Sequence, residues 1–384
     1  NADTENHNLA IGTSALGGAV AGGEYNVAVG NYSLDALTSA DFCTAVGYQA
    51  GSAINSGGYN TLMGHQAGLG MTSGNTNTAV GAGAMQTNTV GDRNTAVGSG
   101  ALQTFNPSSN TDNNNTAVGY GALNELTTGV NNIAIGSLAL GGAVTTESNN
   151  LAIGCGAMAA NINGGEDNVA IGNGALASLT TADGTVAIGF EAGNAVTTDG
   201  GGSIFIGKAA GHDITTGHSN IMIGEFAGDG FDAETHNVAI GRGAFGGAVN
   251  GGEFNICVGN FSLMALTSGD SNTAVGDESG TANTTGYNNT FVGQRAGAGV
   301  TEGFSNVLIG ANAAHGNSVT LTTGDQNTLV GRNIQTTDAN SNTANGLGYF
   351  LSCEGGYTTV GQSGDDIRAA HGTATWATVS DERF

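Results

Sequence analysis

The chain has 384 residues, and its 69 glycines, against a usual share of about 7%, exclude an ordinary helical domain. Seven Lys and Arg face 31 Asp and Glu, so the formal net charge of −24 would repel nucleic-acid phosphates and excludes that class of partner. Apolar residues occur only in short runs, so we expect no membrane insertion and no signal peptide. Because the first residue is Asn1 and not Met, we expect a longer parent polypeptide.

One motif, Asn-x-Ala-[Val/Ile]-Gly-x-x-Ala, recurs nineteen times, and its central glycine returns every 17 or 18 residues with two spacings of 21. These glycines are Gly12, Gly30, Gly47, Gly64, Gly81, Gly98, Gly119, Gly136, Gly154, Gly172, Gly189, Gly207, Gly224, Gly241, Gly259, Gly276, Gly293, Gly310 and Gly331. Such a period is typical of a solenoid in which each repeat forms one coil. We therefore predict an all-β repetitive parallel solenoid rod over residues 1–335, with a C-terminal cap over residues 336–384. With degenerate copies at Gly348 and Gly361, its coils would rise to about 100 Å at a ladder spacing of about 4.8 Å.

Within each unit the chain is expected to run from a corner through a strand and a glycine into a turn. Asn opens 16 of the 19 copies, and stacked Asn side chains predict a hydrogen-bonded ladder at the corner. The repeat glycine ends the strand, where positive φ or close backbone approach would exclude a Cβ. Glycines assigned this structural role include Gly12, Gly98, Gly119, Gly136 and Gly241.

The strand itself is apolar on both faces. The residue before the glycine is Val or Ile in 18 of 19 copies, and two residues earlier the position holds Thr, Val, Ile or Leu. These two columns share a face, and we expect a β-branched core ladder there. The intervening column is mostly Ala and faces the opposite way. Because one coil can bury only one face, we expect another copy of the chain to cover the other, which makes the protein an obligate oligomer.

The unit resembles a known repeat, as in residues 115–123, Asn-Thr-Ala-Val-Gly-Tyr-Gly-Ala-Leu. It is similar to the head repeat of trimeric autotransporter adhesins and to related repeats of phage tail fibres, from residue 6 to about residue 335. The resemblance implies a left-handed parallel β-roll and a homotrimer in which three chains pack about a common axis.

The C-terminal residues resemble the junction before the intramolecular chaperone of phage tail spikes and fibres. The matching segments are Thr359-Val360-Gly361, Asp365-Asp366-Ile367-Arg368 and the run from Trp376 to Phe384. In that family the chaperone directs trimer assembly and is released by self-cleavage at a Ser-Asp bond. The resemblance therefore makes Ser380 and Asp381 processing-site candidates. Autocleavage is not assigned to this chain, because the family's downstream lysine and chaperone body do not follow Phe384.

Four aromatic residues gather where the repeat decays. They are Tyr349, Phe350, Tyr357 and Trp376. The first interpretation is that their rings pack a narrowing trimer end. The alternative, a sugar-binding platform, makes them the candidates for receptor contact.

Catalytic and metal sites are not predicted. The carboxylates show no second group at a defined offset for an acid–base pair, so we expect no enzyme activity and no catalytic residue. His218 and His236 fall near the same turn of adjacent coils, and a surface role is preferred to metal binding. The four cysteines lie about a hundred residues apart, which predicts separate thiols. We expect no cofactor and no bound metal.

These features predict a structural fibre protein of a phage tail, extracellular on the virion, that mediates attachment to a host glycan or protein receptor. One alternative is a trimeric adhesin on a bacterial cell surface. Another is a tail spike that carries an enzyme acting on host polysaccharide.

Overall fold

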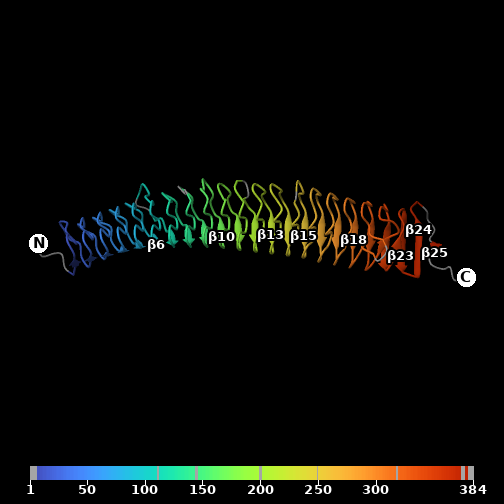
Figure 1. Cartoon of the computed structure of the whole chain (residues 1–384), viewed down its shortest axis with the longest axis horizontal. Coiled ribbons are helices and arrows are strands. Elements are labelled where there is room, and N and C mark those ends of the chain that lie inside the picture. The colour runs from blue at the N-terminus through green and yellow to red at the C-terminus, as the bar shows by residue number, and fades with distance from the viewer. Residues whose placement is uncertain are drawn as a thin grey trace. The chain divides into compact units, whose positions relative to one another are not determined.

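The computed structural model describes residues 7–109, 112–142, 146–198, 201–248, 250–316, 319–372 and 377–378. The chain divides into two compact units, Asn1–Asp199 and Gly200–Phe384, and each is a parallel β-solenoid with one short strand per turn (Figure 1). Together they contain about 20 turns. None of the described residues forms a helix, and hence none forms a helix able to cross a membrane. The prediction of an all-β, repetitive parallel solenoid is confirmed.

The first unit is a ladder of three-residue strands that pair in register with the strand one turn away. For example, Thr95, Ala96 and Val97 pair with Thr116, Ala117 and Val118. The strands are β1 (Leu9–Ile11), β2 (Val27–Val29), β3 (Thr44–Val46), β4 (Thr61–Met63), β5 (Thr78–Val80), β6 (Thr95–Val97), β7 (Thr116–Val118), β8 (Ile133–Ile135), β9 (Leu151–Ile153), β10 (Val169–Ile171) and β11 (Val186–Ile188).

The second unit continues the same pattern within itself and then changes. Parallel pairing runs through β19 to β21 and β23, after which β24 and β25 add antiparallel strands, while β20 and β22 form a separate pair. The strands are β12 (Ile204–Ile206), β13 (Ile221–Ile223), β14 (Val238–Ile240), β15 (Ile256–Val258), β16 (Thr273–Val275), β17 (Thr290–Val292), β18 (Val307–Ile309), β19 (Thr328–Val330), β20 (Gln335–Thr336), β21 (Asn345–Tyr349), β22 (Ser352–Cys353), β23 (Tyr357–Gln362), β24 (Asp365–Ala370) and β25 (Ala377–Thr378).

The interior of each coil is built from the middle residue of the strand. That residue is fully buried in β2 through β19, whereas the residues on either side are half-buried or exposed. The prediction that the Val and Ile column forms a core ladder is therefore wrong for the single chain. Neighbouring strand residues point to opposite faces, and the narrow interior takes the Ala column, which turns Val and Ile outward. Exposed members of the outward face include Leu9, Ile11, Met63, Val97, Ile133, Ile135, Ile188, Ile256, Val275 and Ile309.

Side-chain volumes inside the coil are complementary. In many coils the strand supplies Ala and the residue four positions after the repeat glycine is large. Ala117 and Leu123 are such a pair, and both are fully buried. Where the strand supplies Phe205, the corresponding residue is Gly211, and a Cβ on that glycine would overlap the Phe205 ring. Coils of these two kinds hold about one large side chain at this level, which keeps the interior close-packed. Three coils have two small residues instead, in the pairs Ala45 and Gly51, Ala187 and Gly193, and Ala274 and Gly280.

Two features let the coils stack closely, and the first is the conformation of the repeat glycine. Gly12, Gly98, Gly119, Gly136 and Gly241 have φ between 132° and 141°, as predicted for the repeat glycine. A Cβ on Gly241 would lie 2.5 Å from the carbonyl oxygen of the equivalent glycine in the next coil. A side chain at this position would therefore force the strands apart.

The second feature that lets the coils stack is the predicted ladder of Asn side chains, and it is confirmed. The backbone N–H of Asn94 donates to Oδ1 of Asn77 at 2.9 Å, and Nδ2 of Asn77 donates to the carbonyl oxygen of Gly91 at 2.8 Å. Both Asn side chains are buried. The left-handed residue of the corner is the one before the Asn, such as Thr76 with φ 57°. The Asn therefore serves as a buried hydrogen-bonding group, which satisfies amides that would otherwise be unpaired.

Some acidic side chains are structural parts of the coil. Oε2 of the fully buried Glu147 accepts the backbone N–H of Thr146 at 2.8 Å, and its Oε1 accepts that of Gly164 at 2.9 Å. Glu234 receives the same kind of bonds, including one from Gly251 at 2.9 Å. Gly164 and Gly251, whose N–H groups bind these carboxylates, have φ of 106° and 101°, a conformation that favours glycine. In the sequence analysis the carboxylates were considered only as acid–base pairs, and these buried structural ones were not identified.

Replacing Asn283 with Leu is expected to stabilise the second unit by roughly 1–3 kcal/mol. Asn283 is fully buried, and neither Nδ2 nor Oδ1 has a hydrogen-bond partner among the described residues. The matching position of other coils holds apolar residues such as Leu266 and Val300. Urea titration followed by circular dichroism measures the effect.

Asn88 provides the matched control. It occupies the same position in its own coil, but its Oδ1 accepts the N–H of Gly91 at 2.8 Å and its Nδ2 donates to the Gly91 carbonyl at 3.1 Å. Asn88→Leu should give no comparable gain, because it removes satisfied hydrogen bonds. A lower urea midpoint for Asn283→Leu would show that its amide is satisfied in solution.

Thiol reactivity should separate one cysteine from the other three. Cys155 is exposed, whereas Cys43, Cys257 and Cys353 are buried, and all four are free thiols. Burial raises the pKa of Cys353 to about 12 and also raises the pKa values of Cys43 and Cys257. At pH 8 these buried thiols therefore stay protonated and unreactive. Maleimide labelling with mass analysis should give one adduct on the native chain and four after denaturation, and rapid native labelling of Cys353 would contradict the packing at that end.

Candidate functional site

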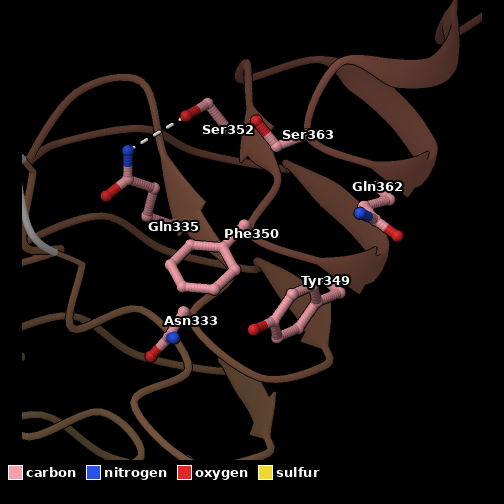
Figure 2. Close-up of a pocket in the computed structure, with 7 residues that line it drawn as sticks. All are labelled: Asn333, Gln335, Tyr349, Phe350, Ser352, Gln362 and Ser363. Carbon is pink, nitrogen blue, oxygen red and sulfur yellow. Dashed lines mark hydrogen bonds between the residues drawn. The ribbon is translucent and has the colours of Figure 1, made fainter.

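A pocket of about 330 Å³ opens in the second unit, where the regular coils give way to longer strands. Figure 2 shows its lining around the rings of Tyr349 and Phe350. The seven lining residues are Asn333, Gln335, Tyr349, Phe350, Ser352, Gln362 and Ser363. Its volume is at the lower end of the range for small-molecule sites.

The backbone places two aromatic rings side by side at this pocket. Tyr349 is the last residue of β21 and pairs in register with Gln362 on β23. Phe350 follows with a left-handed φ of 53°, and its N–H donates to the carbonyl oxygen of Arg332 at 3.2 Å. The two rings meet edge to face with centroids 4.5 Å apart, and both residues are about 40% exposed. The pair therefore presents a partly open aromatic surface.

Amides and hydroxyls surround this surface. Nε2 of Gln335 donates to Oγ of Ser352 at 2.9 Å, which fixes one edge of the pocket (Figure 2). The N–H of Ser363 donates to the Tyr349 carbonyl at 3.2 Å and ties the turn after β23 to the end of β21. None of the seven lining side chains carries a charge. An aromatic surface bordered by neutral donors and acceptors suits an uncharged, hydroxyl-bearing ligand better than an ion.

Tyr357, another predicted receptor-contact residue, does not line this pocket. Tyr357 begins β23, about 16 Å along that strand from Gln362 at the usual rise per residue. There the guanidinium of Arg368 lies over the Tyr357 ring at 5.1 Å and pairs with Glu354 at 2.8 Å. Tyr357 thus belongs to a separate surface cluster. Trp376 and the processing-site candidates Ser380 and Asp381 lie outside the described residues.

Sequence reasoning identified the two rings but missed the polar lining. The signal was available in the repeat register, because Asn333, Phe350 and Ser363 each follow a glycine of the repeat by two residues. Residues in one column stack in a solenoid, so the three belong to a single surface. Gln335, Ser352 and Gln362 lie on the irregular strands β20, β22 and β23, whose pairing the repeat does not encode.

Histidines and other aromatic rings stack on one another. The predicted neighbours His218 and His236 are in edge contact at 5.4 Å, and His236 stacks on Phe254 at 5.0 Å. In the first unit His7, Tyr25, Phe42 and Tyr59 form a stack with centroid spacings of 4.8, 5.1 and 5.0 Å. Within the described part of the chain no group of three or more His, Cys, Asp or Glu is placed to hold a metal ion. These rings therefore receive a structural assignment, as partners of each other.

Known proteins offer no assignment for this site. No family model matches the chain, and neither the curated proteins nor the solved structures contain a match. The fold thus defines the class of protein, a repetitive, helix-free parallel β-solenoid.

Proposed function

We propose that this chain is the rod of a homotrimeric phage tail fibre, wound as a left-handed parallel β-roll and extracellular on the virion. In this proposal the fibre carries out no reaction and attaches the particle to a glycan on the host surface. The observation that carries it is the outward apolar face, which the single chain leaves half-exposed along both units.

The outward face supports self-association over a solitary chain. Val, Ile or, once, Met occupies the position before the repeat glycine in every three-residue strand from β1 to β19. A soluble monomer rarely exposes an apolar patch of more than a few hundred Å². An identical chain in parallel register matches this column coil for coil, and three such chains about an axis give closed symmetry. The resemblance of the repeat to those of trimeric fibres supports three copies over any other number.

The chemistry of the Tyr349–Phe350 pocket supports a sugar as the receptor group. C–H faces of a sugar ring pack on aromatic surfaces, and its hydroxyls can bond the amides of Asn333, Gln335 and Gln362. Three identical chains would present three such pockets. Multivalent attachment can exceed the affinity of one site by 10² or more without new contacts.

Electron microscopy of virus particles labelled with gold-conjugated antibody against the purified chain tests the proposal. Label on fibres of the tail is expected. Label on bacterial envelopes would contradict a viral fibre and favour the adhesin alternative. Release of reducing sugars from host polysaccharide by the purified chain would contradict a purely binding role and favour the enzyme-bearing spike.

A further inference from the structure

A second pocket, of about 310 Å³, lies elsewhere in the second unit, beside Gly243, which has no side chain. Phe226, Gly243 and Phe261 occupy the same position in three successive coils, each two residues after a repeat glycine. The glycine leaves an opening between two aromatic residues, which the ladder places about 10 Å apart along the coils. The Phe261 ring borders the opening at Gly243, and a Cβ on that glycine would lie 3.1 Å from the ring.

A cation and a carboxylate border this opening. The guanidinium of Arg242 lies over the Phe261 ring at 5.6 Å, and its Nε is 3.6 Å from Oε2 of Glu225. Asp229 lines the pocket from the coil of Phe226, and its Oδ1 would lie 3.0 Å from a Cβ on Gly246. Asp229 is half-buried, and this burial raises the pKa of its carboxyl. The pocket therefore offers both hydrogen-bond donors and an acceptor.

Cations are rare in this chain, yet two gather here. Lys208 stacks on Phe226 at 4.9 Å and shares Glu225 with Arg242, at 3.7 Å. The two cations offset Glu225 and Asp229, and Asp213 adds a further carboxylate close to Asp229. A free anion would meet two carboxylates, and a pure hydrocarbon would desolvate Arg242 and Asp229 without replacing their hydrogen bonds. The matching ligand is neutral, with one apolar face and several hydroxyls.

We infer that the Phe226–Phe261 pocket binds one sugar residue of a glycan, separately from the Tyr349–Phe350 pocket. The apolar face of the sugar packs on the phenyl rings, while its hydroxyls bond Arg242 and Asp229. The exposed Met264 on the pocket wall receives an apolar substituent, such as the methyl of an acetamido group. This inference rests on the proposed role in glycan attachment and deepens it by adding a second site.

Saturation-transfer NMR on the full chain in its native oligomer tests the inference, with methyl glycosides of glucose and N-acetylglucosamine as probes. The wild-type chain is measured as the reference, and the pocket variants are compared in the Phe350→Asn background, which removes the ring from the other pocket. Asn is chosen because residues 261 and 350 both have left-handed φ of 53°, which Asn tolerates. Adding Phe261→Asn should lower transfer to the acetamido methyl at least fivefold, and the glucoside should give a weaker signal than the N-acetyl sugar.

Phe254→Asn in the same background is the matched control. Phe254 precedes the strand of the same coil, has φ 58° and is 55% exposed, but does not line the pocket. It should leave the transfer unchanged, and near-identical far-ultraviolet circular dichroism should verify folding of each variant. Equal losses from both substitutions would overturn the inference.

Two further outcomes distinguish failure of the second site from failure of the proposed function. A signal in the wild-type chain that vanishes in the Phe350→Asn background would overturn the second site and leave glycan attachment standing. No transfer from either probe to the wild-type chain would overturn the second site as inferred. Gold label on tail fibres would in that case still support the viral fibre.

Discussion

Replacing Phe205 with Ala should destabilise the second unit by roughly 3–5 kcal/mol, the usual cost of removing a fully buried phenyl ring. Phe205 fills the middle of β12, where most coils have Ala, and Gly211 lies against its ring. Gly211→Leu should also destabilise, because its Cβ would overlap that ring. Urea titration of each variant by circular dichroism measures both effects.

The double variant Phe205→Ala, Gly211→Leu tests the volume relation itself. It recreates the Ala117 and Leu123 pair of another coil, so it should recover most of the stability lost in either single change. Residue 211 already has a left-handed φ of 59°, close to the 51° of Leu123, so the backbone accepts Leu there. Losses that simply add in the double variant would contradict the complementary packing.

Replacing Ile135 with Asp should dissociate the proposed trimer while leaving the chain folded. Ile135 ends β8 on the outward face and is 39% exposed in the single chain. On a free surface the change would alter stability by only about 0.5 kcal/mol. At a threefold interface it would bury three unpaired carboxylates at one level, and each uncompensated buried charge costs about 3–5 kcal/mol. For a trimer the dissociation constant scales as the square of the midpoint concentration. The midpoint concentration of dissociation should therefore rise at least a thousandfold, which corresponds to about 8 kcal/mol per trimer.

Leu138→Asp is the control for that variant. Leu138 belongs to the same coil and is 43% exposed, but it lies in the turn after the repeat glycine and not on the strand. Analytical ultracentrifugation of both variants over a dilution series should find association lost only for Ile135→Asp. Loss in both, or in neither, would show that the outward strand face is not the interface.

Most of the coil could be predicted from sequence because the repeat samples each position nineteen times. The strand before the repeat glycine, the positive φ of that glycine and the Asn ladder all follow from columns with one chemical preference. The direction of the strand faces could not be predicted, because both are apolar. Residue size carried the missing information: Ala117 alternates in volume with Leu123, and Phe205 with Gly211, while Val118 has no such partner. Side chains that alternate in volume in this way share a limited space, so they identify the face of the strand that points into the coil.

The candidate site was harder to predict because it depends on where the repeat fails. Tyr349 and Phe350 stand out as aromatic residues in a chain with only 6% of them, and the structure places both at one pocket. Tyr357 does not line that pocket, since its position along β23 and its contact with Arg368 separate that ring, and its role in receptor contact stays a prediction. The Phe226–Phe261 pocket follows from an absent side chain at Gly243, which composition alone does not reveal.

The mass of the particle in solution tests the central claim, that the outward strand face is covered by further copies of this chain. Size-exclusion chromatography with multi-angle light scattering at micromolar concentration measures that mass directly. We predict three times the 37.6 kDa of one chain, in a particle that stays intact on dilution. A stable, soluble particle with the mass of one chain would contradict the claim.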